Sequence, residues 1–465
     1  MLVNFRLYLR SRIPVYALCA LAPWAAAQNS VPSALQGSVV QGKATGQVLP
    51  LSMDEAIRMG LHNNLAGIAQ SANVESAGGQ HLQQLQSLLP TITGTAQETV
   101  AQVNLQAEGL RVPGFPAVIG PYGYSDFRAT LKQTLLSVSS IQSFIASRHL
   151  LTASRLSQAN TADLIVLAVG NAYMLCLADD ARVSSVEAQV KTSKVSLDQA
   201  VLNHQNGVSP RLDELRARVD YQTQEQALIA AQNDYQKDKI ALARAIGLPL
   251  AQRFRLSDET PFAKIGAPDF QQAMKDAEQN RSDLKAAEQQ ELAAERSLSA
   301  AHAERYPELT AEADYGEIGV NPANSYATLD ATGKVSGPIF EEGKLRGDAK
   351  VASAQLAQAR AQYNNLQGQV RADVKDAILD IEAAEKLVSV ARSNVALANE
   401  ALSEAQQRFQ AGVSDNLAVS QAQSAVADAS NRYVSSLYQY NVARLSLARA
   451  TGVARLKYKT YLEGQ

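Results

Sequence analysis

Apolar residues recur in alternating steps of four and three over a long stretch in the second half of the chain. This alternation is the heptad seam of helices that pack along their length. The spacing predicts a helix over about 345–410, roughly 100 Å long at 1.5 Å per residue. From residue 377 onward one line of the seam is entirely Ala, which lets helix backbones approach closely. The seam positions are Val370, Val374, Ala377, Ile381, Ala384, Val388, Ala391, Val395, Ala398, Leu402, Ala405 and Phe409.

A matching seam lies 205 residues earlier in the chain. Cys176 occupies one of its core positions, which favours a packing role over a reactive thiol. On a second face of the later helix, apolar Leu387, Val390, Leu397 and Ala401 indicate another neighbour, as a closed ring of helices requires. A plain two-helix coiled coil is the alternative. The earlier seam has apolar Val169, Ala172, Cys176, Val183, Val186, Val190, Leu197 and Ala200, and polar Asp179, Ser193 and His204.

The two seams belong to a duplicated unit. LARAIG at 242–247 returns as LARATG at 447–452, and GVS at 207–209 returns at 412–414. Further upstream the offset is 217, because AIRMGLHNN at 56–64 aligns with AMKDAEQNR at 273–281. The difference falls across a Gly/Pro-rich insertion at 109–123, so the sequence predicts two equivalent units with unequal loops.

Each unit has the same predicted order: an opening helix, a β-hairpin, and two long helices joined by a Gly turn and ended by Gly247 or Gly452. The opening helices are expected over 52–88, with Ser52 as N-cap, and over 268–303. The predicted divisions are an extended segment 28–50, a first repeat 51–247 with hairpin 91–135, a connecting segment 248–267, a second repeat 268–452 with hairpin 308–336, and a tail 453–465.

Within the hairpins the hydrophobic pattern changes to period two, which predicts strands with one apolar and one polar face. Phe127, Ala129, Leu131 and Leu135 alternate with Arg128, Thr130, Lys132 and Thr134; the strands near 309–315 and 327–335 alternate similarly, and 91–105 is the least regular. About ten residues per strand suits a tilted crossing of a bilayer, although a soluble sheet with one wet face alternates in the same way. Interfacial aromatic residues are expected at Tyr122, Tyr124, Phe127, Tyr315 and Tyr326.

Four strands cannot close, and open edges are not tolerated in lipid, so several chains must share one barrel. Two chains would give eight strands, too narrow for a pore, whereas three give twelve. The expected fold is therefore mainly α, with long coiled-coil helices in an α-barrel and four strands per chain of a trimeric, 12-stranded transmembrane β-barrel. The candidate lumen-facing residues are Arg128, Lys132, Glu312 and Asp314.

Residues 1–27 have the pattern of a secretory signal peptide. A basic start precedes a short apolar stretch at 13–24 and a run of Ala at 25–27, and the stretch is too short for a membrane anchor. Cys19 lies inside this leader in a context that disfavours lipid attachment. No later run has the length of a transmembrane helix, so insertion is expected through strands. The basic residues of the leader are Arg6, Arg10 and Arg12.

Composition and chemistry narrow the function. The chain has 43 Lys and Arg against 45 Asp and Glu, so it lacks the basic surplus of a nucleic-acid-binding protein. Cys176 is the single Cys outside the leader, which excludes an intrachain disulfide in the mature chain. There is no phosphate-binding Gly loop or nucleophile–base set, so no catalytic residue, metal or cofactor is expected. The scattered histidines are His62, His81, His149, His204 and His302.

The sequence resembles the TolC-type outer-membrane efflux protein family over roughly residues 50–453. The resemblance rests on LSMDEAIRMGLHNN at 51–64, LLP at 88–90, GPIFEEGKLRG at 337–347, RFQAGVSDNLAVSQAQ at 408–423 and LARATG at 447–452. It implies a homotrimer in the outer membrane of a Gram-negative cell, with a helical tunnel in the periplasm. It also implies docking to a periplasmic adaptor and an inner-membrane transporter, as the passive exit duct of a tripartite efflux or type I secretion system.

Members of this family often narrow the periplasmic end with acidic residues after the second Gly turn. The equivalent places here are uncharged in the second unit (Ala418 and Gln421), whereas the first has Asp213 and Arg216. Candidate gate residues are therefore Asp213 and Asp415, and candidate adaptor-docking turns are Gly207-Val208 and Gly412-Val413. The alternative function is a soluble periplasmic coiled-coil adaptor or structural rod, which needs no membrane-length strands.

Overall fold

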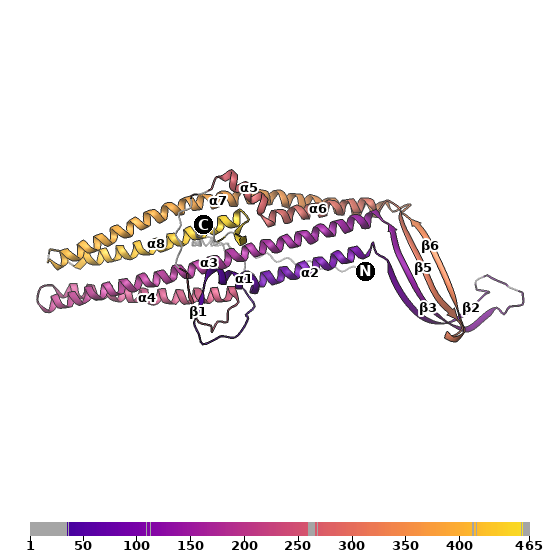
Figure 1. Ribbon diagram of the computed structural model, residues 1–465, viewed down its shortest axis with the longest axis horizontal. Coiled ribbons are helices and arrows are strands. Elements are labelled where there is room, and N and C mark those ends of the chain that lie inside the picture. Colours follow the sequence, from indigo (N-terminus) through magenta and orange to yellow (C-terminus); the bar gives the residue numbers. More distant parts are fainter. Residues whose placement is uncertain are drawn as a thin grey trace, which may run out of the picture.

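The computed structural model describes residues 35, 37–107, 109–111, 113–258, 266, 268–411, 413–414, 416–456 and 458. The predicted signal peptide 1–27, Gly412 and Asp415 lie outside the described residues. The molecule is long and narrow, with four strands at one end and the tips of two helical hairpins at the other (Figure 1).

Two very long helices run along the molecule (Figure 1). They are α3 (Val138–Gln205) and α7 (Glu342–Gln410), with 68 and 69 residues. Each turns back into a shorter helix, α4 (Arg211–Ile246) or α8 (Asn416–Ala450). The prediction of a helix over about 345–410 is confirmed to within a few residues. The two seams described in the sequence lie on α3 and α7, the first helix of each hairpin.

The seam of α7 is buried where the core is thickest and becomes half-buried towards the tip. Val370, Val374, Ala377, Ile381, Ala384, Val388 and Ala391 are buried, whereas the positions from Val395 to Phe409 are intermediate. Two adjoining clusters make the core near the middle of the molecule, one around α1, α3 and α4 and the other around α5, α7 and α8. The hairpin tips therefore extend beyond the main core.

The opening helix of each unit is two helices, and the prediction of single helices over 52–88 and 268–303 is wrong. The first pair is α1 (Met53–Asn63) and α2 (Leu65–Gln86), and the second is α5 (Phe270–Asn280) and α6 (Ser282–Ala303). Asn64 adopts an extended conformation, with ψ 132°, and its side chain accepts a hydrogen bond from the Ala66 amide at 2.9 Å. It thereby ends one helix and caps the next. Ser52 caps α1 as predicted, through the Glu55 amide.

The strands are longer than the ten residues expected. They are β2 (Thr91–Asn104), β3 (Val118–Leu136), β5 (Glu308–Gly319) and β6 (Ser325–Ser336), paired antiparallel in the order β2-β3-β5-β6. The helices behind them contact one another in the corresponding order, α2 to α3 to α6 to α7. A second small sheet pairs β1 (Leu49–Leu51) in parallel with β4 (Phe254–Leu256), which joins the N-terminal segment to the connecting segment.

One described helix, α3, is long and apolar enough to cross a membrane by length and composition alone, and 56% of its most apolar stretch is buried inside the chain. The expectation that no later run has this length is therefore wrong. The physical reason is the position of α3 in the molecule. It contacts α1, α2, α4, α6 and α8. A helix in the centre of the core needs apolar side chains on several sides, because each side packs against a neighbour.

Candidate functional site: the strand surface and the helix tips

The register of the four strands separates apolar and polar side chains onto opposite faces. On one face Ile92 is opposite Leu131, and Leu131 is opposite Ala313. On the other face Thr91 is opposite Lys132, and Lys132 is opposite Glu312. The first strand, the least regular in sequence, follows the rule as far as Ala96, because the small residues Gly94 and Ala96 fall on the apolar face. Beyond that point the charged side chains of Glu98 and, on β5, Glu317 also fall on the apolar face.

All four candidate lumen residues lie together on the polar face, where they form cross-strand ion pairs. Lys132 Nζ lies 3.0 Å from Glu312 Oε1. Arg128 pairs with Asp314, and its Nε lies 3.3 Å from Asp126 Oδ1 on the same strand. Opposite charges on adjacent strands satisfy each other and reinforce the register. This face therefore presents a band of paired charges among Thr side chains.

The opposite face carries large apolar side chains that no described residue covers. Ile92, Tyr315, Leu329 and Val335 are among the most exposed apolar residues of the described molecule. A soluble domain rarely exposes a continuous apolar surface of this kind. Contact with lipid would bury it without any further protein.

Only part of the expected aromatic girdle lies on the apolar face. Phe127 and Tyr315 lie on that face, because Phe127 is opposite Ala96 and Tyr315 is opposite Ala129. Tyr122 and Tyr124 are spaced evenly from Arg128 and therefore lie on the polar face, and Tyr326 pairs there with Ile318. The sequence prediction that all five share an interfacial position is wrong because period two assigns even and odd residues of a strand to different faces.

At the opposite end, the first helical hairpin turns at Gly207, whose φ of 74° is the left-handed conformation that Gly adopts without a steric penalty. Val208 follows it and is 72% exposed, as is Val413 in the second turn at 70%. Both tips thus present an apolar side chain to the surroundings. The described tip residues are compatible with the predicted docking turns, whose function stays a prediction.

Asp213 lies in the first turn of α4, and its side chain is only 11% exposed. Its carboxylate lies 3.8 Å from Arg216 Nη1, and its amide donates to the Pro210 carbonyl at 3.1 Å. In a single chain this carboxylate is thus packed within the hairpin rather than projecting from it.

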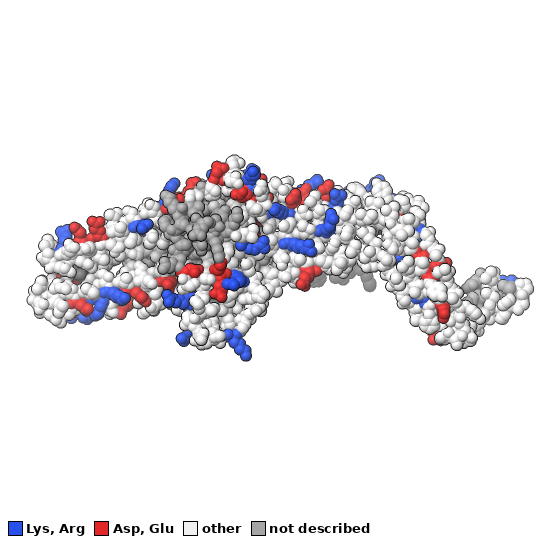
Figure 2. All heavy atoms as spheres, in the orientation of Figure 1, with Lys and Arg blue, Asp and Glu red and all other residues white. Residues whose placement is uncertain are grey.

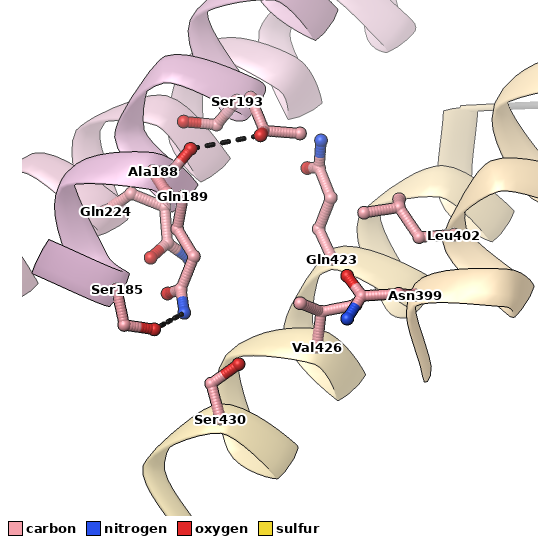
Figure 3. Close-up of a pocket in the computed structure, with 11 residues that line it drawn as sticks. Ser185, Ala188, Gln189, Ser193, Gln224, Asn399, Leu402, Gln423, Val426 and Ser430 are labelled. Carbon is pink, nitrogen blue, oxygen red and sulfur yellow. Dashed lines mark hydrogen bonds between the residues drawn. The ribbon is translucent and has the colours of Figure 1, made fainter. Parts of the chain in front are cut away.

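A cavity of about 200 Å³, lined mainly by polar residues, lies between the two hairpins, on the side of the core that faces the hairpin tips. Side chains from α3 and α4 face side chains from α7 and α8 across it (Figure 3). Close to it, Gln423 Nε2 donates to Ser196 Oγ at 2.8 Å, which joins α8 to α3. The sequence contained a signal for this polar contact, because Ser193 interrupts the apolar seam and lines the cavity. Its labelled lining includes Ser185, Gln189, Ser193, Asn399, Gln423 and Ser430.

The remaining candidates for chemistry have structural roles. Cys176 is fully buried, and burial raises the pKa of its thiol to about 12, so it is not a reactive nucleophile. Among the described residues no group of three or more His, Cys, Asp or Glu side chains is placed to hold a metal ion. Acidic and basic side chains are interspersed along the helical part on the face seen in Figure 2.

Comparisons with known proteins agree with these features. A family model described as outer membrane efflux protein matches residues 57–248 and 273–453, one segment for each repeat. The toluene efflux pump outer membrane protein TtgC of Pseudomonas putida is 22% identical over 417 residues, which cover 86% of this chain and 83% of TtgC.

Solved structures share the fold at low sequence identity. The outer membrane protein VceC of Vibrio cholerae has a TM-score of 0.74 at 20% identity, covering 86% of this chain and 96% of that one. A membrane protein from Pseudomonas aeruginosa has a TM-score of 0.77 at 19% identity, covering 86% and 93%. The two segments matched by the family model include both long hairpins and both pairs of strands of the present chain.

Proposed function

The chain belongs to the outer membrane efflux protein family, and we propose that three copies of it form a passive exit duct across the outer membrane. The strands cross the membrane and the helices extend through the periplasm. The observation that carries this proposal is the four-stranded sheet with one bare apolar face and one polar face. Because the family consists of outer-membrane efflux proteins, it favours the duct over a soluble periplasmic adaptor.

The proposed number of copies follows from closure of the sheet. Strands β2 and β6 are its two edges and have no partner on their outer side among the described residues. Such edges require a further strand in a membrane, since unpaired backbone groups are costly in lipid. Three copies provide twelve strands, wide enough for a water-filled interior that the polar face would line. Eight strands from two copies would be filled by side chains.

The energy for transport is proposed to come from partners, because the family is one of channels and no catalytic arrangement is needed for a passive duct. The hairpin tips at Gly207-Val208 and Gly412-Val413 are proposed to dock a periplasmic adaptor, which would connect the duct to an inner-membrane transporter. The exposed Val208 and Val413 support this role. Val208→Asp combined with Val413→Asp should abolish capture of a periplasmic adaptor that binds the wild-type chain, and undiminished capture would remove the turns from the interface.

Asp213 and Asp415 are proposed as charged groups near the periplasmic gate. The packing of the Asp213 carboxylate beside Arg216 suggests that it acts by holding the tip closed rather than as an exposed ring. Asp213→Ala should then raise single-channel conductance, with Asp198→Ala on exposed α3 surface as the matched control. Equal currents for Asp213→Ala and wild type would exclude the residue from the gate.

The duct itself is tested by purification from outer membranes and reconstitution into planar bilayers. We expect a particle with three times the chain mass after subtraction of bound detergent, and discrete conductance steps. A monomer without conductance, or recovery of the chain in the soluble fraction, would overturn the proposal.

A further inference from the structure

One lateral edge of the chain is formed by helix α2, which runs between the core and strand β2. No residue of this 22-residue helix is buried within the chain, although it contains Leu65, Ile68 and Leu82, all more than 40% exposed. It contacts α1 and α3 but has no helix on its outer side among the described elements. An apolar helix face without cover in an aqueous compartment indicates a missing neighbour.

The other lateral edge is formed by strand β6 and helix α7, and its most exposed apolar residues lie in the link between them. Ile339 and Phe340 are 101% and 92% exposed, as much as residues with no neighbours at all. The link is short, because β6 is paired with β5 up to Ser336 and α7 begins at Glu342. Two large apolar side chains are thus held in solvent by an ordered backbone.

Closure of the proposed trimer brings these two edges together. Strand β6 ends at Ser336 beside the helices, and β2 begins at Thr91 beside the helices. When β6 of one copy pairs antiparallel with β2 of the next, residues 337–340 therefore come next to residues 87–90. Leu89, which is itself 45% exposed, and Leu82 on the preceding helical turns then face the link.

We propose that Ile339 and Phe340 of each copy pack against Leu82 and Leu89 of the next copy, forming a hydrophobic clasp at the junction of barrel and tunnel. This inference rests on the proposed trimer and assigns the surface that locks it. The clasp would join copies where strands give way to helices and where neither lipid nor a continuous helix seam holds them.

A second copy is a better occupant of this surface than lipid. The exposed side of α2 continues to Leu65, about 30 Å along the helix from its strand end, which is well outside the bilayer region. Small residues on both edges also leave room for a close partner. A Cβ added at Gly78 or Gly79 of α2, or at Gly343 or Gly347 of α7, would meet no atom of the chain within 4 Å.

Disulfide trapping tests the clasp. Within one chain, β2 and β6 are three strand spacings apart, about 14 Å, which exceeds the reach of a disulfide of roughly 7 Å between Cα atoms. Leu89→Cys with Phe340→Cys should therefore give covalent dimers and trimers after mild oxidation in membranes. The matched control pairs Phe340→Cys with Leu150→Cys on α3, one helix further from the edge, and should stay monomeric. Native Cys176 is buried and does not interfere.

Tryptophan fluorescence separates a protein neighbour from lipid. Trp24, the only Trp of the chain, lies in the predicted leader, so Phe340→Trp gives a single reporter in the mature protein. Brominated phospholipid should leave its emission nearly unchanged, whereas it should quench Leu329→Trp on the apolar strand face. Equal quenching of both variants, or monomers only from the 89/340 pair, would overturn the clasp. If wild-type chains still form conducting trimers in that case, the proposed duct stands; if they do not, the duct itself fails.

Discussion

Arg281 is a buried charge that joins three segments of the second unit. It separates α5 from α6, is 4% exposed, and its guanidinium nitrogens lie 2.7 Å from both Asp283 and Asp373. Burial disfavours the charged form of Asp283, but hydrogen bonds and charges from Arg281 and Arg449 outweigh it and lower its pKa to about 2. The first unit makes the equivalent break with neutral Asn64, so the two hinges reach the same geometry by different chemistry.

Removal of the Arg281 side chain should therefore be severe. Arg281→Ala leaves the Asp283 carboxylate buried with one fewer cation, and we expect a loss of about 3 kcal/mol in the free energy of unfolding. Arg360→Ala is the matched control, since it breaks an exposed ion pair with Glu291 and should cost under about 1 kcal/mol. Denaturant unfolding in detergent measures both. Similar midpoints for the two variants would contradict the structural role of Arg281.

Asp179 is a polar exception in an apolar seam, and the structure gives the reason for its unusual environment. Burial and the neighbouring carboxyl of Asp238 on α4 raise the pKa of Asp179 to about 7, with Asp234 adding to the shift and Arg182 opposing it. Burial and the charges of these two acids also raise the pKa of Tyr438, on α8. In the second unit the positions equivalent to Asp179 and Asp238 are Ala384 and Ala443, and both are buried.

This carboxyl pair should make stability depend on pH. Asp179 is protonated in the folded chain up to about pH 7, whereas in an unfolded chain it releases its proton near pH 4. The folded state therefore binds the extra proton, and the free energy of unfolding falls as pH rises through that window. Asp179→Ala should raise stability at pH 8 by roughly 1–2 kcal/mol, after discounting for solvent screening, and change it little at pH 4. Asp198→Ala on the exposed surface is the control; a pH-independent effect of Asp179→Ala would contradict the raised pKa of Asp179.

At the scale of elements, heptad spacing was the most informative part of the sequence. It predicted α7 and its buried positions because a long seam must be apolar at each contact. It could not predict the breaks at Asn64 and Arg281, since each depends on a cap or on ion pairs with residues distant in sequence. Period two predicted the strands and both faces, and applied residue by residue it also assigns Tyr122, Tyr124 and Tyr326 to the polar face.

The Ala line of the seam should be intolerant of larger side chains. Ala384 is buried in the cluster shared by α5, α7 and α8, which also contains Tyr440 and Ala443. Ala384→Leu adds three carbons to a packed contact and should cost about 1–3 kcal/mol. Ala396→Leu adds the same volume at an exposed position of α7 that lies on neither apolar face, and it should be nearly neutral. Unfolding of both proteins measures the difference, and equal stability would contradict close packing along this line.

At the scale of the whole molecule, duplication explains why sheet and helices have the same lateral order. Each unit contributes one hairpin of strands and the helices that continue it, so placing the two units side by side gives β2-β3-β5-β6 above α2, α3, α6 and α7. Repeat offsets in the sequence predicted this duplication. They could not reveal the bare edges at α2 and at Ile339-Phe340, because exposure appears only once the chain is folded and its neighbours are counted.

The polar strand face decides what the assembled duct would select, and this can be tested by reversing one charge. Per chain it carries Asp126, Glu308, Glu312, Asp314 and Asp330 against Arg128, Lys132 and Lys334. Three copies would multiply the small acidic excess around one lumen, where low-dielectric walls strengthen the field of each charge. Lys132→Glu would break the pair with Glu312 and add six negative charge units to the trimer.

We therefore expect Lys132→Glu to shift the reversal potential under a KCl gradient towards the potassium equilibrium value, by several millivolts or more. Lys237→Glu, at an exposed position of α4 far from the strands, makes the same charge change outside the barrel and should leave the reversal potential closer to wild type. The effect should weaken at high salt as the Debye length falls from about 10 Å at 0.1 M to about 3 Å at 1 M. If both variants gave the same potential, the ion-paired face could not line the conducting path.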